Sequence, residues 1–117
     1  MREPMRDPSR LEHIMSAIEK IEEYTKDITY EQFVADSMRM HATTYNIQII
    51  GEAVYKLSKE FKEKHSDITW VLAEKMRHIL VHDYYQVSAK VVWNVVEEDV
   101  PVLKKAVRAI VGKMSEK

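Results

Sequence analysis

The chain contains no cysteine, only two glycines and three prolines. Without cysteine it can form neither a disulfide framework nor a thiolate zinc site, which fits a reducing cytoplasm. The scarcity of glycine and proline leaves little turn-forming material and favours helices joined by short loops. No apolar run approaches the length of a bilayer span, and the first ten residues are too polar for a signal peptide or membrane anchor.

A charge excess of one sign is also missing. The 18 Lys and Arg residues are balanced by 19 Asp and Glu residues, for a net charge of −1. The protein therefore lacks a general electrostatic attraction to nucleic acid, and contact with RNA requires a local site. The length of 117 residues, with 32% charged and 45% hydrophobic residues, is typical of a globular protein. We expect a single domain over residues 1–117.

What the chain has in abundance is apolar residues at helical spacing. Between Leu11 and Ile21 they recur every three to four positions, which predicts an amphipathic helix. Asp7 is the expected N-cap of this helix, with proline in its first turn. Thr29 and Gln32 then form the pattern of a capping box and predict the start of a second helical region.

The rest of the chain continues the helical pattern. Asp36 is either a break or a second cap, and a central helix is predicted from Met38 to about Phe61. A last long helix is predicted over residues 88–112, with a kink at Pro101 because proline removes a backbone donor. No segment alternates with a period of two. The sequence predicts an all-α protein, an antiparallel bundle of four to five helices.

The segment from Arg77 to Tyr85 concentrates polar chemistry beside a short apolar run. On an ideal helix, Arg77 and His82 are separated by about 140° around the axis. They converge only if the helix loosens near His82 or if two copies of the protein face each other. His78 and His82, four positions apart, share one face.

Four interpretations fit these residues. In metal-independent RNA cleavage, His82 would exchange a proton while Arg77 holds the phosphate. A metal site at His78 and His82 lacks a third ligand that the sequence places, so no metal is predicted. Tyr84 is a phenol that can accept a covalent modification. The structural interpretation pairs Arg77 with Asp83 and uses His82 to satisfy a backbone carbonyl.

The spacing Arg77, four residues, His82, one residue, Tyr84 resembles the signature of HEPN-domain proteins of the HepT-like toxin family. The resemblance covers about residues 10–111. Further familial segments are residues 11–14, 49–53, 92–93 and 98–101. His78 departs from the pattern, because relatives often carry Asn after the arginine. Both side chains are polar and can contact a phosphate.

The resemblance implies a homodimer in which two motifs face one another across a cleft. It implies a metal-independent endoribonuclease that acts as the toxin of a toxin–antitoxin pair, with Arg77 and His82 as catalytic residues. A minimal nucleotidyltransferase antitoxin would transfer AMP from ATP to Tyr84. ATP and magnesium would belong to that partner, so this chain itself is expected to carry no cofactor. His78, Asp83 and Glu52 are further candidates to line the cleft.

The alternative is a non-catalytic helical module that binds a nucleotidyltransferase partner or RNA without cutting it. The net charge of −1 favours this module, whereas the intact set of Arg77, His82 and Tyr84 favours the enzyme. Glu52 has its own structural interpretation as a solvated or salt-bridged glutamate. Loss of RNA cleavage in a folded His82→Ala variant separates the enzyme from the module.

Overall fold

The computed structural model describes residues 6–66, 70 and 89–115, and these residues form helices and no strand. The elements are α1 (Arg6–Thr25), α2 (Tyr30–Ala35), α3 (Ser37–Lys56), α4 (Lys59–Lys64), α6 (Ala89–Asn94), a π-helical turn (Val95–Asp99) and α7 (Val100–Ser115). The predicted all-α bundle is confirmed. Among the described helices, none is long and apolar enough to cross a membrane.

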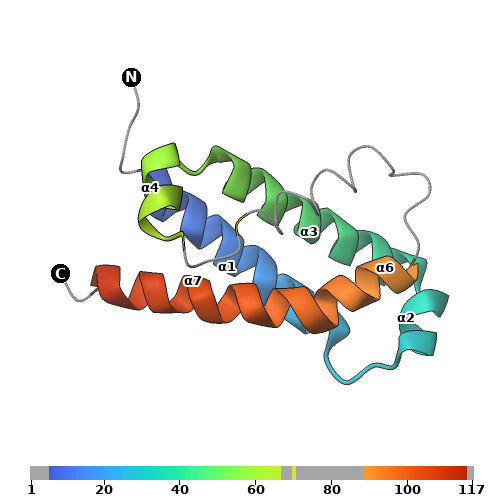
Figure 1. Cartoon of the computed structure of the whole chain (residues 1–117). Helices are drawn as coiled ribbons and strands as arrows, with labels where there is room; N and C mark the ends of the chain where they lie inside the picture. Colours follow the sequence, from blue (N-terminus) through green and yellow to red (C-terminus); the bar gives the residue numbers. More distant parts are fainter. Residues whose placement is uncertain (1–5, 67–69, 71–88, 116–117) are drawn as a thin grey trace.

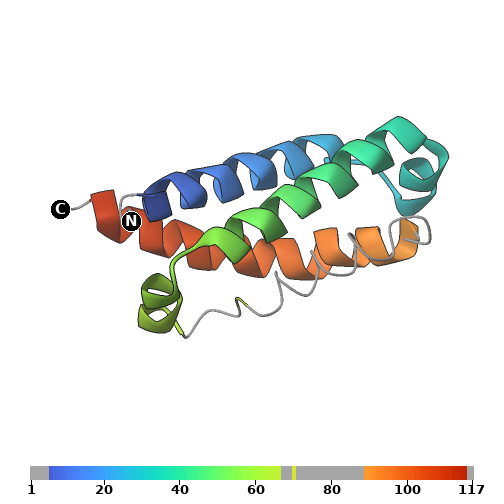
Figure 2. The ribbon, with the colours of Figure 1, turned by 90° about the horizontal axis from the view of Figure 1, so that it is seen from above.

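The long helices lie side by side in a bundle (Figures 1 and 2). The chain runs out along α1 and returns along α3, so these two helices are antiparallel. The continuous helix formed by α6, the π-helical turn and α7 also runs opposite to α1. α2 and α6 lie at one end of the bundle, and α4 lies at the other, near the start of α1 and the end of α7 (Figure 1).

The core is built from the apolar stripes of these helices. From α1, Leu11, Ile14, Ile18 and Ile21 are fully buried, as the helical spacing predicts. They meet buried residues from α2, α3 and α7. These are Phe33, Ile47, Ile50, Val54, Leu103, Val107 and Ile110. Burying such side chains stabilises the fold by roughly 1.5–3 kcal/mol each.

Aromatic side chains join α6 to α2. The Trp93 ring lies 5.1 Å from that of Phe33 and 5.9 Å from that of Tyr30, measured between ring centroids. Lys90 adds a cation–π contact, with its ammonium nitrogen 5.6 Å from the centre of the Tyr30 ring. The short α2 is therefore held by its neighbours, because six residues are too few for a stable isolated helix.

The disturbance expected at Pro101 takes the form of a π-helical turn over Val95–Asp99. There the Val100 N–H donates to the Val95 carbonyl, five residues earlier. Pro101 has no N–H to give and its ring crowds the carbonyl one turn back, so a widened turn accommodates it without ending the helix. Beyond it the helix passes the predicted end near Gly112 and continues to Ser115.

The junctions between helices confirm one expectation and correct two. The capping box of Thr29 and Gln32 is present, with bonds of 3.1 and 2.9 Å. The central helix does not reach Phe61, because α3 ends at Lys56 and Ser58 caps the separate α4. Asp7 is not the cap of α1. It lies inside the helix and is 8% exposed.

Asp7 instead binds the cap of α4. Its two carboxylate oxygens accept from the Ser58 N–H at 2.9 Å and the Ser58 hydroxyl at 2.8 Å. The same hydroxyl accepts from the Phe61 N–H at 3.0 Å. A contact across 51 positions of sequence thus fixes where α3 stops and α4 starts, which no local pattern could indicate.

Candidate functional site

The five motif residues to which the sequence assigns chemistry lie outside the described residues: Arg77, His78, His82, Asp83 and Tyr84. Their roles stay predictions. The sixth candidate, Glu52, is described. It lies half-buried on α3 and lines a pocket between α1 and α3.

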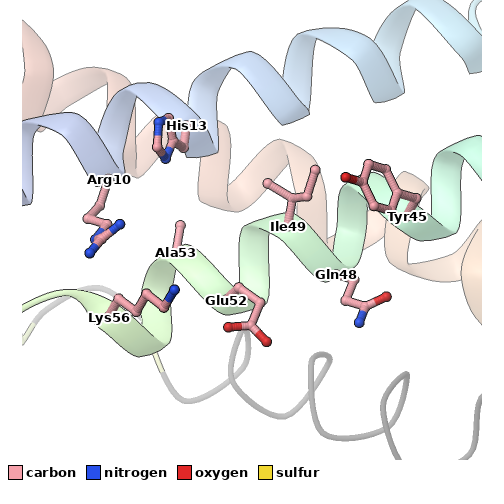
Figure 3. A pocket seen from close by; sticks show the side chains of 8 residues that line it. All are labelled: Arg10, His13, Tyr45, Gln48, Ile49, Glu52, Ala53 and Lys56. Atoms are coloured by element: carbon pink, nitrogen blue, oxygen red, sulfur yellow. The ribbon is translucent and has the colours of Figure 1, made fainter.

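This α1/α3 pocket has a volume of about 280 Å³. Its residues come from the first half of α1 and the second half of α3 (Figure 3). They are Arg10, His13, Tyr45, Gln48, Ile49, Glu52, Ala53 and Lys56. The set combines two permanent cations, a histidine, an aromatic ring, an amide and one carboxylate around a small apolar floor.

The pocket arises beside the core contact of its two helices. On α3, Ile50 and Val54 pack into the core, and the next positions around the helix carry Ile49 and Ala53. These two side chains point toward α1 (Figure 3). Because Ala53 has only a methyl group, it leaves space between the helices, and larger polar side chains close that space at its edges.

The pocket's two permanent cations come from different helices. Arg10 extends from α1 toward Lys56 on α3, while the Glu52 carboxylate is turned away from Arg10 (Figure 3). The Arg10 Nε is buried and has no hydrogen-bond partner in the part of the chain that the structure describes. Within the same part, no carboxylate lies within ion-pair distance of Arg10 or Lys56.

Tyr45 lies at the opposite end of the pocket from Arg10 and Lys56 (Figure 3). Its side chain is 64% exposed, although its helical spacing from Ile49 and Ala53 is that of an apolar stripe. An exposed ring at one end of a pocket can stack on a flat part of a ligand, while cations at the other end bind an anionic part of it.

Arg39 shows what a structural arginine looks like in this fold. Its backbone N–H and its Nε donate to the two oxygens of Asp36, at 3.0 and 3.2 Å, and its guanidinium also donates to the Tyr24 carbonyl. The first of these bonds, from the backbone N–H, does most to hold the pKa of the Asp36 carboxyl below its ordinary value. Arg39 therefore fixes the junction of α2 and α3.

The pKa of Asp99 is displaced in the opposite direction to that of Asp36. Burial in the π-helical turn raises the pKa of the Asp99 carboxyl above its ordinary value, and the neighbouring Glu98 carboxylate adds to the rise. Asp99 and Glu98 lie in the segment 98–101, which is one of the segments that resemble the family. Because Pro101 follows this turn by two residues, the local geometry of the turn is an adaptation of the helix backbone to proline.

A metal centre needs at least three suitable side chains close together. Over residues 6–66, 70 and 89–115, no group of three His, Asp or Glu residues has that arrangement. The proposed pair of His78 and His82 lies outside these ranges. Among the described residues that line the pocket, only His13 and Glu52 are of this kind, and Arg10 and Lys56 repel a divalent cation.

The helical fold and the sequence place the chain in a defined class. The model of a family described as "Ribonuclease HepT-like" matches residues 14–110. The chain belongs to this HepT-like ribonuclease family. The resemblance carried by the spacing of Arg77, His82 and Tyr84 is thereby confirmed at the level of the family.

Individual relatives agree with the family match. A protein of Caldanaerobacter subterraneus subsp. tengcongensis named "Putative RNase" is 40% identical over 103 residues, which cover 88% of this chain and 92% of the relative. A "Probable ribonuclease HepT" of Thermococcus cleftensis is 42% identical over 94 residues, 80% of this chain and 86% of the relative.

A third relative is longer than this chain. A "Gamma-glutamylcyclotransferase and putative RNase" of Methanocaldococcus jannaschii is 40% identical over 104 residues, which cover 89% of this chain but 47% of that protein. No solved structure matches the chain in the structural comparison.

Sequence reasoning missed the polar residues of the pocket. His13 has no spacing relation to the other histidines, and Tyr45 shares the helical spacing of an apolar stripe with Ile49 and Ala53. Arg10 and Lys56 are 46 positions apart, so only the pairing of α1 with α3 brings them together. Their one sequence signal is a polar position next to the buried stripe of each helix.

Proposed function

We propose that this chain is a metal-independent endoribonuclease and the toxin of a toxin–antitoxin pair. The observation that carries the proposal is the spacing of Arg77, His82 and Tyr84 in a chain that belongs to the HepT-like ribonuclease family. Two relatives whose names assign them to the ribonucleases, each about 40% identical over most of both chains, support it.

The proposed reaction needs no group beyond the RNA and two side chains. The 2′-hydroxyl attacks the adjacent phosphorus, a new P–O bond closes a 2′,3′-cyclic phosphate, and the bond to the 5′-oxygen breaks. His82 takes the proton of the 2′-hydroxyl or supplies the proton that the 5′-oxygen gains. Arg77 binds the phosphate and stabilises the negative charge that builds on its oxygens.

Silencing would occur at Tyr84. A minimal nucleotidyltransferase partner that holds ATP and magnesium would transfer AMP to the phenol. The tyrosine oxygen forms a bond to the α-phosphorus, pyrophosphate leaves, and the phenolic proton passes to the solvent. The added phosphodiester is negatively charged and bulky, so it repels RNA and blocks its approach to Arg77 and His82.

The site is proposed to be shared by two subunits. Residues five apart on a helix point about 140° away from each other. Two facing motifs avoid this difficulty, because Arg77 of one subunit and His82 of the other can meet at one phosphate. Light scattering at micromolar protein should therefore give the mass of a dimer, and a monomer at that concentration contradicts the shared site.

The decisive experiment incubates purified protein with total RNA in EDTA, for the wild type, Arg77→Ala and His82→Ala. We expect cleavage by the wild type alone, with 2′,3′-cyclic phosphate ends identified by mass spectrometry. General acid–base catalysis is typically worth about 10²–10⁴ in rate, so His82→Ala should lower the rate constant by a factor in that range. Circular dichroism serves as the control for folding.

Two other outcomes would replace the proposal. Cleavage that needs a divalent cation and stops in EDTA would point to metal chemistry at His78 and His82. RNA bound but left intact by all three proteins would point to the non-catalytic module. The role of Tyr84 is tested separately, by incubation with the partner, ATP and magnesium. Tyr84→Phe should gain no AMP in the mass spectrum, while Tyr85→Phe should still gain it.

A further inference from the structure

We propose that the α1/α3 pocket is a binding subsite for single-stranded RNA, in which Tyr45 stacks on a base while Arg10 and Lys56 bind a backbone phosphate. The inference rests on the proposed function for its choice of ligand. It adds a place for the substrate at residues outside the motif, on helices that the structure describes.

The strongest observation is that two positively charged side chains in the pocket, Arg10 and Lys56, lack acceptors among the described residues. They line this one pocket from two helices. The Arg10 Nε is buried, and a buried N–H without an acceptor is unfavourable, whereas Lys56 is exposed and free to turn toward a ligand. Elsewhere the chain does provide acceptors: Arg39 has Asp36, and Lys104 bonds the Glu22 carboxylate at 2.6 Å. A bound phosphate would supply the missing oxygens in the pocket.

The aromatic ring identifies the kind of anion. Tyr45 is 64% exposed and lines the same pocket, and stacking of bases on such rings is the common way in which proteins hold single strands. Tyr45 and Lys56 are 11 positions apart on α3, about 16 Å along a helix. Stacked bases rise by about 3.4 Å, so a phosphate at Lys56 and a base at Tyr45 belong to different nucleotides.

Other ligands fit the pocket less well. A lone inorganic anion would use Arg10 and Lys56 but leave Tyr45 exposed. Among the described lining residues, a divalent cation would find two candidate ligands, His13 and Glu52. A polynucleotide uses both ends of the pocket, and the Glu52 carboxylate is turned away from Arg10 at the phosphate-binding end (Figure 3).

A local subsite also explains how a protein without an excess of positive charge can bind RNA. With a net charge of −1, the protein has no general attraction to RNA. Two cations left unpaired at one place create a positive site without changing the overall balance. Their contribution should depend on salt, because binding one phosphate of a single strand releases about 0.7 of a counterion.

The test uses a fluorescent oligoribonucleotide of about 12 nucleotides, blocked against cleavage by 2′-O-methyl groups. Binding is measured by anisotropy at several salt concentrations. Tyr45→Ala should raise Kd about tenfold or more and leave the salt dependence unchanged, since stacking is an uncharged contact. Tyr45→Phe should bind like the wild type, because the ring is retained.

The double variant Arg10→Gln with Lys56→Gln should raise Kd and also reduce the slope of log Kd against log salt by about 0.7. Two matched controls lie outside the pocket. Met38→Ala removes a large side chain from the same helix at a position that is 82% exposed. Lys59→Gln with Lys105→Gln removes two charges from exposed sites. Both controls should leave Kd within a factor of two or so of the wild type.

Failure of this inference and failure of the proposed function can be told apart. An unblocked oligonucleotide of the same sequence reports cleavage by the wild type. If the wild type cleaves and the folded pocket variants bind like their controls, the subsite is wrong and the ribonuclease stands. If the pocket variants lose affinity while the wild type cleaves nothing, the subsite stands and the ribonuclease is wrong. Equal loss in the pocket variants and the controls also overturns the subsite.

Discussion

The helix junctions and the α1/α3 pocket place charged side chains in opposite situations. At the junctions the chain supplies partners for its own charges: Asp7 receives two bonds from Ser58, and Asp36 receives two from Arg39. In the pocket, cations from two helices approach each other and meet no acceptor within the described residues. The junction charges are used within the fold, where they define the ends of helices, whereas the pocket charges remain available to a ligand.

Arg39 and Arg10 show the same difference between two residues of one type. Arg39 donates to a carboxylate and to the Tyr24 carbonyl, and both acceptors belong to this chain. The buried Nε of Arg10 has no acceptor among the described residues. If the difference is functional, removing the junction charges should lower the free energy of unfolding, whereas removing the pocket charges should leave it nearly unchanged.

The largest effect on stability is expected from Asp7→Ala. The substitution removes two hydrogen bonds to a nearly buried carboxylate and leaves the Ser58 N–H without that acceptor. Hydrogen bonds to charged groups contribute about 1.5–3 kcal/mol. We expect a loss of about 2–3 kcal/mol in the free energy of unfolding, measured by urea denaturation.

Glu12→Ala is the matched control, since it removes an exposed carboxylate from the same helix and should change stability by less than about 0.5 kcal/mol. Asp7→Asn keeps one oxygen acceptor and should fall between the two. Equal stability of Asp7→Ala and Glu12→Ala would show that the contact between α1 and α4 adds nothing.

A smaller loss is expected at the exposed cap of α2. Thr29→Ala removes the hydroxyl that accepts from the Gln32 N–H, and such caps are typically worth about 1 kcal/mol. Thr29→Ser retains the hydroxyl and is the control. The urea midpoint should fall for alanine alone, with an unchanged slope. A loss in Thr29→Ser as large as in Thr29→Ala would contradict the cap.

The contrast between the caps also shows what the sequence could predict. The box of Thr29 and Gln32 spans four residues, so local spacing was enough to find it. The end of α3 was not predictable in that way. Leu57 continues the apolar pattern, and the partner of Ser58 is Asp7, 51 positions away. Prediction from periodicity therefore found the helices and their buried faces but misplaced this boundary.

The two candidate sites also differ in whether their residues are close in sequence. The spacing of Arg77, His82 and Tyr84 is contiguous in sequence, so resemblance alone led to the family that the comparisons confirm. The pocket depends on which helices pack together. Arg10 and Tyr45 carry no shared spacing, and the position of Tyr45 fits an apolar stripe with Ile49 and Ala53. Only the packing of α1 on α3 shows that both residues line one pocket.

The next prediction contrasts two acids whose pKa values are displaced in opposite directions. The pKa of Asp36 is lowered, mainly by the bond from the Arg39 N–H, so its ionised form stabilises the fold at neutral pH. That stability is lost as the pH falls below about 4, the value for an unfolded chain. The pKa of Asp99 is raised by burial, so the fold loses stability as the pH rises above about 4.

Asparagine at each position removes the charge with little change in shape, and at position 36 it remains a good helix cap. Asp36→Asn should therefore be less stable than the wild type at pH 7, and Asp99→Asn more stable. Both differences should be smaller at pH 3 than at pH 7, because more of each carboxyl is then protonated. Thermal unfolding at the two pH values measures this, and changes of the same sign at pH 7 would contradict the assigned environments.

The smallest effects on stability are expected at two lysines, of which Lys104 has an ion-pair partner and Lys56 has none within the described residues. Lys104→Gln breaks the surface ion pair with Glu22 and should cost less than about 1 kcal/mol, with a smaller loss at high salt. Lys56→Gln breaks no ion pair within the described residues and should change stability by less than about 0.5 kcal/mol in either direction. Urea denaturation at low and high salt measures both. A salt-sensitive loss in Lys56→Gln as large as in Lys104→Gln would show that Lys56 is paired within the fold, and the pocket would then lose one of its two cations as a ligand-binding group.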